Sequence, residues 1–112
     1  MSASIGIQVL PQVGSDEEVC RIVDEVIACI KSTGLRYEVG PLETVIEGEN
    51  FDQLMELAAE CQKTAVRAGA PKVISYIKVI YKPEGEILTI DQKIGKYREG
   101  GLGENGFDDC RK

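Results

Sequence analysis

The chain has 112 residues, of which 43% are hydrophobic and 29% charged, enough for one globular domain with a hydrophobic core. Its net charge is −6 and 5% of its residues are aromatic, which argues against nucleic acid as a partner, because nucleic-acid binders cluster basic and aromatic side chains. Histidine is absent, so the commonest general base and the commonest metal ligand are both missing. This balance favours a neutral or cationic small ligand.

The sequence shows neither a membrane span nor a signal peptide, and this bears on the location of the protein and on the redox state of its thiols. No apolar run approaches the about 20 residues that a membrane-spanning helix needs, and the first residues do not resemble a signal peptide. We therefore expect a cytoplasmic protein with no membrane contact and with reduced thiols. The four cysteines are Cys20, Cys29, Cys61 and Cys110, and no two of them form a CxxC pair. The sequence therefore indicates no metal site, and we expect no other cofactor.

Alternating side chains predict a first strand over Ser4–Leu10, with every second residue apolar. The opposite face carries the small Gly6 and the polar Gln8 in the middle of the strand. A glycine in a strand can mark the close approach of a ligand, and a solvent-facing strand surface fits equally well. Both interpretations stay open.

Two helices are predicted from capping signals followed by one apolar stripe each. Ser15 and Glu18 form a capping box, and this helix extends to about Ser32. Asn50 caps the second helix, which ends at Gly69.

Between the helices, the stretch Tyr37–Gly48 predicts a hairpin that turns at Gly40-Pro41. Its two strands are expected over Leu35–Val39 and Glu43–Glu47. Polar and apolar residues alternate, so one face could offer polar groups to a ligand. The alternative is an ordinary edge hairpin with solvated carboxylates, and the residue pattern alone favours it.

The run Val73–Tyr81 is the most strand-like of the chain and is apolar on both sides. The resulting β-α-β-β-α-β order predicts an α+β, ferredoxin-like sandwich, with a four-stranded antiparallel sheet and both helices on one face. We expect the first and last strands to lie centrally in this sheet. The helices can cover only one side of the last strand, so a second subunit should cover the other. We therefore predict a homo-oligomer, a dimer or tetramer, that associates through the sheet face.

The end of the chain predicts a short helix over Thr89–Arg98 and a flexible, acidic, Gly-rich tail over 99–112. Residues 1–98 would then form the ligand-binding domain. Motifs for dinucleotide or phosphate binding are absent, as is a nucleophile elbow. Glu43 and Glu47 lie about 13 Å apart along a strand, too far for the paired carboxylates of a glycosidase. A binding protein is therefore favoured over an enzyme.

Four motifs resemble, in the same order, those of the small thiamine-binding proteins related to YkoF: SIGIQVLP, YEVGPLETVIEG, VISYIKVIYK and TIDQKIGKYR. The resemblance covers roughly Ile5–Arg98 and is most specific over Tyr37–Gly48. It implies a ferredoxin-like domain that pairs through its sheet and binds thiamine or its hydroxymethylpyrimidine part without catalysis.

The same resemblance implies that the ligand lies over the open sheet face, near the subunit contact. Thr44 would hydrogen-bond the pyrimidine, Glu47 would accept from its exocyclic amine or offset the thiazolium charge, and Gln8 would supply an amide. Thr44 and Glu47 point to opposite faces of a regular strand, and the sequence does not decide which of them faces the ligand. A bulge near Glu47 could change this geometry.

The resemblance also implies aromatic contacts, with Tyr37 and Tyr76 offering rings for stacking or cation–π interaction. Glu43 stands where a smaller polar residue is expected and would affect ligand preference. Lys78 is a weaker candidate, because a lone lysine on a strand is usually solvated or paired with an acid. Two other functions stay open: an oligomerisation domain without a ligand, and an enzyme acting on a thiamine precursor.

Overall fold

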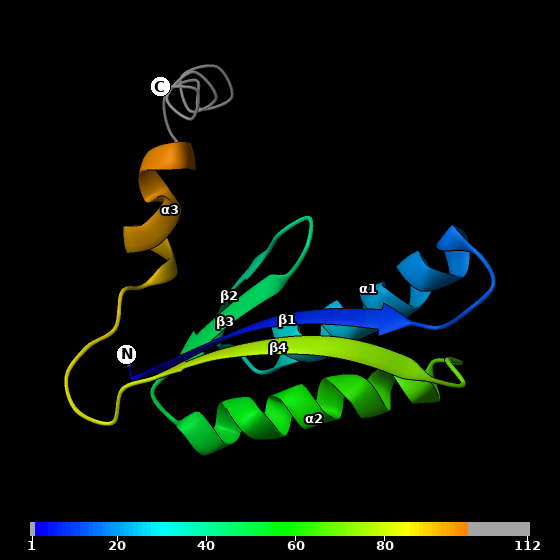
Figure 1. The fold of residues 1–112 in the computed structure, drawn as a ribbon, viewed down its shortest axis with the longest axis horizontal. Helices are drawn as coiled ribbons and strands as arrows, with labels where there is room; N and C mark the ends of the chain where they lie inside the picture. The colour runs from blue at the N-terminus through cyan, green and yellow to red at the C-terminus, as the bar shows by residue number, and fades with distance from the viewer. Residues whose placement is uncertain (1, 99–112) are drawn as a thin grey trace.

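A computed structural model of the protein describes residues 2–98, so the predicted tail, 99–112, and its Cys110 lie outside the described residues. The four strands are β1 (Ala3–Pro11), β2 (Arg36–Val39), β3 (Thr44–Gly48) and β4 (Val73–Tyr81). The three helices are α1 (Asp16–Ser32), α2 (Phe51–Arg67) and α3 (Ile90–Arg98). Their order along the chain, visible in Figure 1, confirms the predicted β-α-β-β-α-β arrangement with a short helix after it.

The strands form one antiparallel sheet in the order β2-β3-β1-β4, which is the ferredoxin-like topology. Strand β1 is central, as expected, but β4 lies at the edge, so the expectation of a central last strand was wrong. Apolar residues on both sides of a strand show that both of its faces can be buried and do not fix its lateral position. On the helix side of β4, Ile77 is still 40% exposed because no further strand of the described chain flanks it.

Both long helices begin where the capping residues predict. The Ser15 hydroxyl accepts from Glu18 N (3.2 Å), and the side chain of Asn50 accepts from Gln53 N (3.0 Å). Gly34 ends α1 with a φ of 74°, a conformation that glycine adopts without steric cost.

The core lies between α1, α2 and one face of the sheet, which we call the covered face. Its fully buried side chains come from both helices and both central strands: Ile5, Ile22, Ile30, Ile46, Leu54 and Cys61. Burial raises the pKa of the Cys61 thiol to about 12, so this group stays protonated and serves as apolar packing at neutral pH.

The opposite face of the sheet, which we call the open face, receives the alternate side chains. Residues paired directly across strands share a face, which places twelve residues here: Ser4, Gly6, Gln8, Leu10, Arg36, Glu38, Val45, Glu47, Ile74, Tyr76, Lys78 and Ile80. Helix α3 contacts the part of this face that β2 and β3 form. Within residues 2–98, none of the three helices has the length and hydrophobicity needed to cross a membrane.

Candidate functional site

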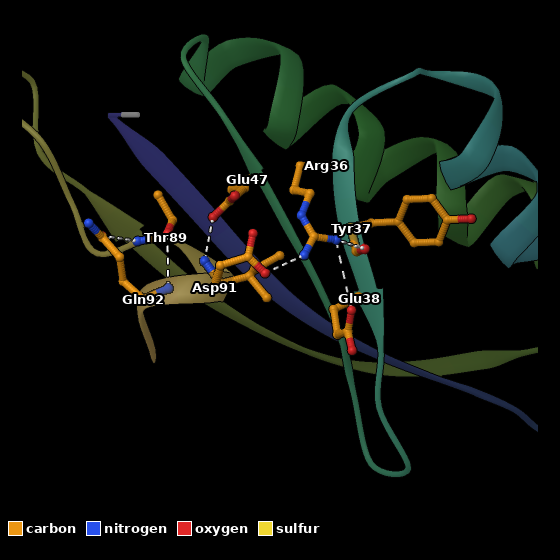
Figure 2. A network of polar contacts seen from close by, with 8 residues as sticks. Arg36, Tyr37, Glu38, Glu47, Thr89, Asp91 and Gln92 are labelled. Atoms are coloured by element: carbon orange, nitrogen blue, oxygen red, sulfur yellow. Dashed lines mark hydrogen bonds and ion pairs between the residues drawn. The ribbon is translucent and has the colours of Figure 1, made fainter. Parts of the chain in front are cut away.

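Two polar contacts hold the N-terminal end of helix α3 against the open face (Figure 2). The backbone N–H of Ile90 donates to Glu47 Oε2 (2.9 Å), and Arg36 Nη2 donates to Asp91 Oδ1 (2.8 Å). The same end carries its own capping box, in which Gln92 N donates to Thr89 Oγ1 (3.1 Å) and Thr89 N donates to Gln92 Oε1 (2.8 Å). We call the Glu47–Ile90 and Arg36–Asp91 contacts the clasp of α3.

Glu47 is 4% exposed, an unusual state for a carboxylate. It is tolerated because the helix N-terminus supplies a hydrogen-bond donor and a favourable dipole. Ile90, the donor residue, is itself only 4% exposed, so the Glu47–Ile90 contact of the clasp is closed to water. A ligand could reach Glu47 only if the N-terminal end of α3 moved away.

A pocket of about 360 Å³ lies beside this clasp, on the open face, with a size suited to a small organic ligand. Its walls come from β1, β3, β4 and α3, with Glu43 just before β3: Ser4, Gly6, Glu43, Val45, Lys78, Val79, Ile80 and Lys93. Most of these side chains are apolar or small, and the charged groups are one carboxylate and two ammonium groups.

An ion pair crosses the floor of this pocket. Lys78 Nζ lies 2.7 Å from Glu43 Oε2, and the strand between them presents Gly6, which pairs directly with Lys78. A Cβ on Gly6 would lie 2.7 Å from Glu43 Oε1. The carboxylate of Glu43 therefore lies over β1 because the strand lacks a side chain at this point.

A second pocket of about 430 Å³ continues from the first towards the turn of the β2–β3 hairpin. It shares three residues with the first pocket and adds one residue of β2, three of the hairpin loop and one of α3: Glu38, Gly40, Pro41, Leu42 and Ile94. We call the two together the trough; Glu43, Val45 and Lys78 belong to both of its parts.

Of the residues implied by the resemblance, Glu43 lies in the trough and Glu47 in the adjoining clasp. Gln8 and Tyr76 pair with each other on the open face, beyond the trough residues, and Tyr76 is 63% exposed. Gln8, Glu47 and Tyr76 therefore lie on the same face of the sheet as Glu43 but do not line its pocket.

Thr44 and Tyr37 lie on the other side of the sheet. Thr44 pairs with the buried Ile7 and is 6% exposed, while Tyr37 pairs with the buried Ile46 and packs against the core. The structure thus decides what the sequence left open: Glu47 faces the open side and Thr44 the covered side.

The sequence interpretation missed the contribution of α3, whose Lys93 and Ile94 form part of the trough. The spacing of Ile90 and Ile94 in the sequence indicates that they share one face of a helix. It does not indicate which surface of the protein that face contacts. The alternative of pairing with an acid, considered for Lys78, is confirmed by its contact with Glu43. In residues 2–98, no group of three or more Cys, Asp or Glu side chains is placed to hold a metal ion.

Comparison with known proteins identifies the family. Residues 5–98 match the profile of the family described as thiamine-binding protein. The chain belongs to this family. A UPF0045 protein of Clostridium perfringens is 42% identical over 97 residues, which cover 87% of this chain and 98% of that protein. A UPF0045 protein of Mycobacterium tuberculosis is 35% identical over 94 residues, covering 84% and 89%.

Solved structures agree with this assignment. A protein of Bacillus cereus, described as the domain of unknown function DUF77, superposes with a TM-score of 0.77 at 38% identity, covering 88% of this chain and 92% of that one. A Thermotoga maritima protein, named provisionally as a thiamine biosynthesis/salvage protein, has a TM-score of 0.74 at 33% identity, covering 88% and 100%. The family match includes every trough residue except Ser4.

Proposed function

We propose that the protein binds thiamine, or its hydroxymethylpyrimidine part, in the trough between α3 and the open face, and that it does so without catalysis. Membership in the thiamine-binding family supports a thiamine-related role, as does the likeness to the Thermotoga maritima protein. The observation that carries the proposal is the carboxylate of Glu43, held on the floor of a pocket large enough for a pyrimidine ring.

The residues of the trough suit both parts of such a ligand. Glu43 can accept a hydrogen bond from the exocyclic amine or offset the thiazolium charge. Val45, Ile80 and Ile94 offer apolar surface for the ring faces. Glu47 enters the site only indirectly, by holding α3 in place as the outer wall.

Calorimetric titration with thiamine tests the proposal, with Glu43→Gln as the decisive variant. Wild-type protein should release heat and bind thiamine, and Glu43→Gln should lower the affinity about tenfold or more, since a hydrogen bond to a charged group contributes about 1.5–3 kcal/mol. Glu56→Gln, on the exposed side of α2 and across the sheet, makes the same charge change away from the trough and should bind as wild type does. Absence of binding by the wild-type protein at millimolar thiamine would refute the proposal.

The non-catalytic part of the proposal rests on the absence of histidine from the sequence and on the use of Glu43 in an ion pair. Thiamine recovered after prolonged incubation with the protein should be chemically unchanged when examined by mass spectrometry. Turnover at a rate above that of buffer alone would contradict this part and leave the binding site in place.

We further propose that a second copy of the chain covers the part of the open face that the first half of β4 forms, beyond the trough. Two apolar side chains there are exposed to 40% and 63%: Ile74 and Tyr76. Sedimentation should therefore detect a dimer or tetramer, and Tyr76→Glu should shift it towards the protomer because a buried charge is costly.

The same apolar residues favour a second candidate function, an oligomerisation domain without a small ligand. The two candidates differ in what Glu43→Gln changes. In a thiamine binder it lowers ligand affinity and leaves the sedimentation of the assembly intact. In a purely structural domain, neither wild type nor Glu43→Gln binds thiamine.

A further inference from the structure

The two side chains of the Glu43–Lys78 ion pair differ in their exposure to solvent. Its carboxylate partner lies against the backbone of Gly6 and is 31% exposed, whereas the Lys78 side chain is 74% exposed. The carboxylate is thus held on the floor of the trough, while the ammonium group reaches it from solvent at the end of a long, flexible stem. Ion pairs of such exposure are weak, so water can readily replace the lysine.

A cationic ligand in this pocket meets a difficulty, because two lysines and one glutamate line it. Lys78 already neutralises the charge that would attract the ligand, and its own charge would repel a neighbouring thiazolium. A cationic ligand that uses the charge of Glu43 therefore competes with Lys78 for this carboxylate.

We propose that Lys78 is a built-in competitor for the carboxylate of Glu43, one that a cationic ligand displaces into solvent on binding. This inference rests on the proposed function and adds a specificity-determining residue to it. In the empty protein, Lys78 holds Glu43 over Gly6 in the orientation that the ligand later uses. The same competition lowers the affinity for weakly interacting cations, which cannot displace the lysine.

The test is a comparison of thiamine affinities by calorimetry in wild type, Lys78→Gln and Lys78→Arg. Lys78→Gln removes the competitor and should raise the affinity about three- to fivefold, the range expected for a weak exposed ion pair. Lys78→Arg keeps a competing cation, so it should not show this gain in affinity. Lys72→Gln removes one positive charge from the residue just before β4, away from the trough, and should also bind as wild type does.

A salt series distinguishes competition from a structural effect of the substitution. The gain in Lys78→Gln should disappear at about 1 M salt, where charges are screened within about 3 Å. Thermal unfolding shows whether each variant is folded, and little change is expected because residue 78 is exposed on an edge strand.

The outcomes separate the two proposals. Thiamine binding by wild type that is unchanged or weakened in Lys78→Gln would overturn the competitor role and leave the binding function standing. Thiamine binding by neither protein would overturn both. A gain that Lys72→Gln reproduces would show an effect of net charge and would also overturn the role of Lys78.

Discussion

The two faces of the sheet bury their side chains in different ways. On the covered face, most side chains of the central strands β1 and β3 are apolar and pack against α1 and α2, so the hydrophobic core is formed within one chain. On the open face, a nine-residue helix covers only part of the sheet, and the remaining surface carries an ion pair, a glycine and exposed apolar side chains. Apolar burial is therefore concentrated on one face, and the other face retains the groups suited to binding.

The largest expected difference between the faces is in stability, and two neighbouring residues of β3 can measure it. Ile46 is fully buried on the covered face, and Val45 is half-buried on the open face. Ile46→Ala should lower the free energy of unfolding by about 2–5 kcal/mol, because it removes buried methyl groups and leaves a cavity. Val45→Ala should cost about 1 kcal/mol or less. Urea denaturation measures both, and equal losses would contradict this division between the faces.

An intermediate effect is expected at Gly6, where the open face depends on a missing side chain. In Gly6→Ala, the new Cβ would meet Glu43 Oε1 at 2.7 Å, and the flexible carboxylate would have to move. We expect a roughly tenfold loss of thiamine affinity, because Glu43 leaves the floor of the trough, with a change in unfolding free energy below about 1 kcal/mol.

Gly14→Ala is the matched control, since a Cβ at residue 14 meets nothing within 4 Å. It should leave thiamine binding unchanged. Wild-type affinity in Gly6→Ala would mean that the position of the Glu43 carboxylate over β1 does not matter for the ligand.

The covered face was largely predictable from the sequence, because its signals are local. Alternation gave the strands, and capping residues such as Ser15 and Asn50 gave the helix starts, so the observed bounds differ from the predicted ones by a residue or two. The lateral place of β4 was not predictable from its side chains, since an edge strand and a central strand can be equally apolar. Chain topology fixes it instead, because β1 pairs with both β3 and β4.

The candidate site was less predictable, because it combines segments distant in sequence. Glu43 could be singled out from the hairpin, but its contact with Lys78 requires the β1–β4 register, and its cover requires α3. The face of Thr44 could have been inferred, since it lies two residues from Ile46 in one strand and so shares its side of the sheet. Sequence spacing thus fixes faces within an element, and only the fold fixes which elements meet.

The smallest expected effect lies in the clasp, where polar contacts hold α3 against the open face. Asp91→Asn removes the charge that pairs with Arg36, and both side chains are partly exposed, so the loss in global stability should stay below about 1 kcal/mol. The backbone amides of α3 should nevertheless exchange with solvent about two- to fivefold faster, since local opening of the helix needs only the clasp to break. Hydrogen exchange measured by mass spectrometry reports this directly. Asp24→Asn, an equal charge change on the exposed side of α1, should leave α3 unaffected. If α3 exchanged at the same rate in Asp91→Asn as in wild type, the hydrogen bond from Ile90 N to Glu47 would be sufficient to hold the outer wall of the trough.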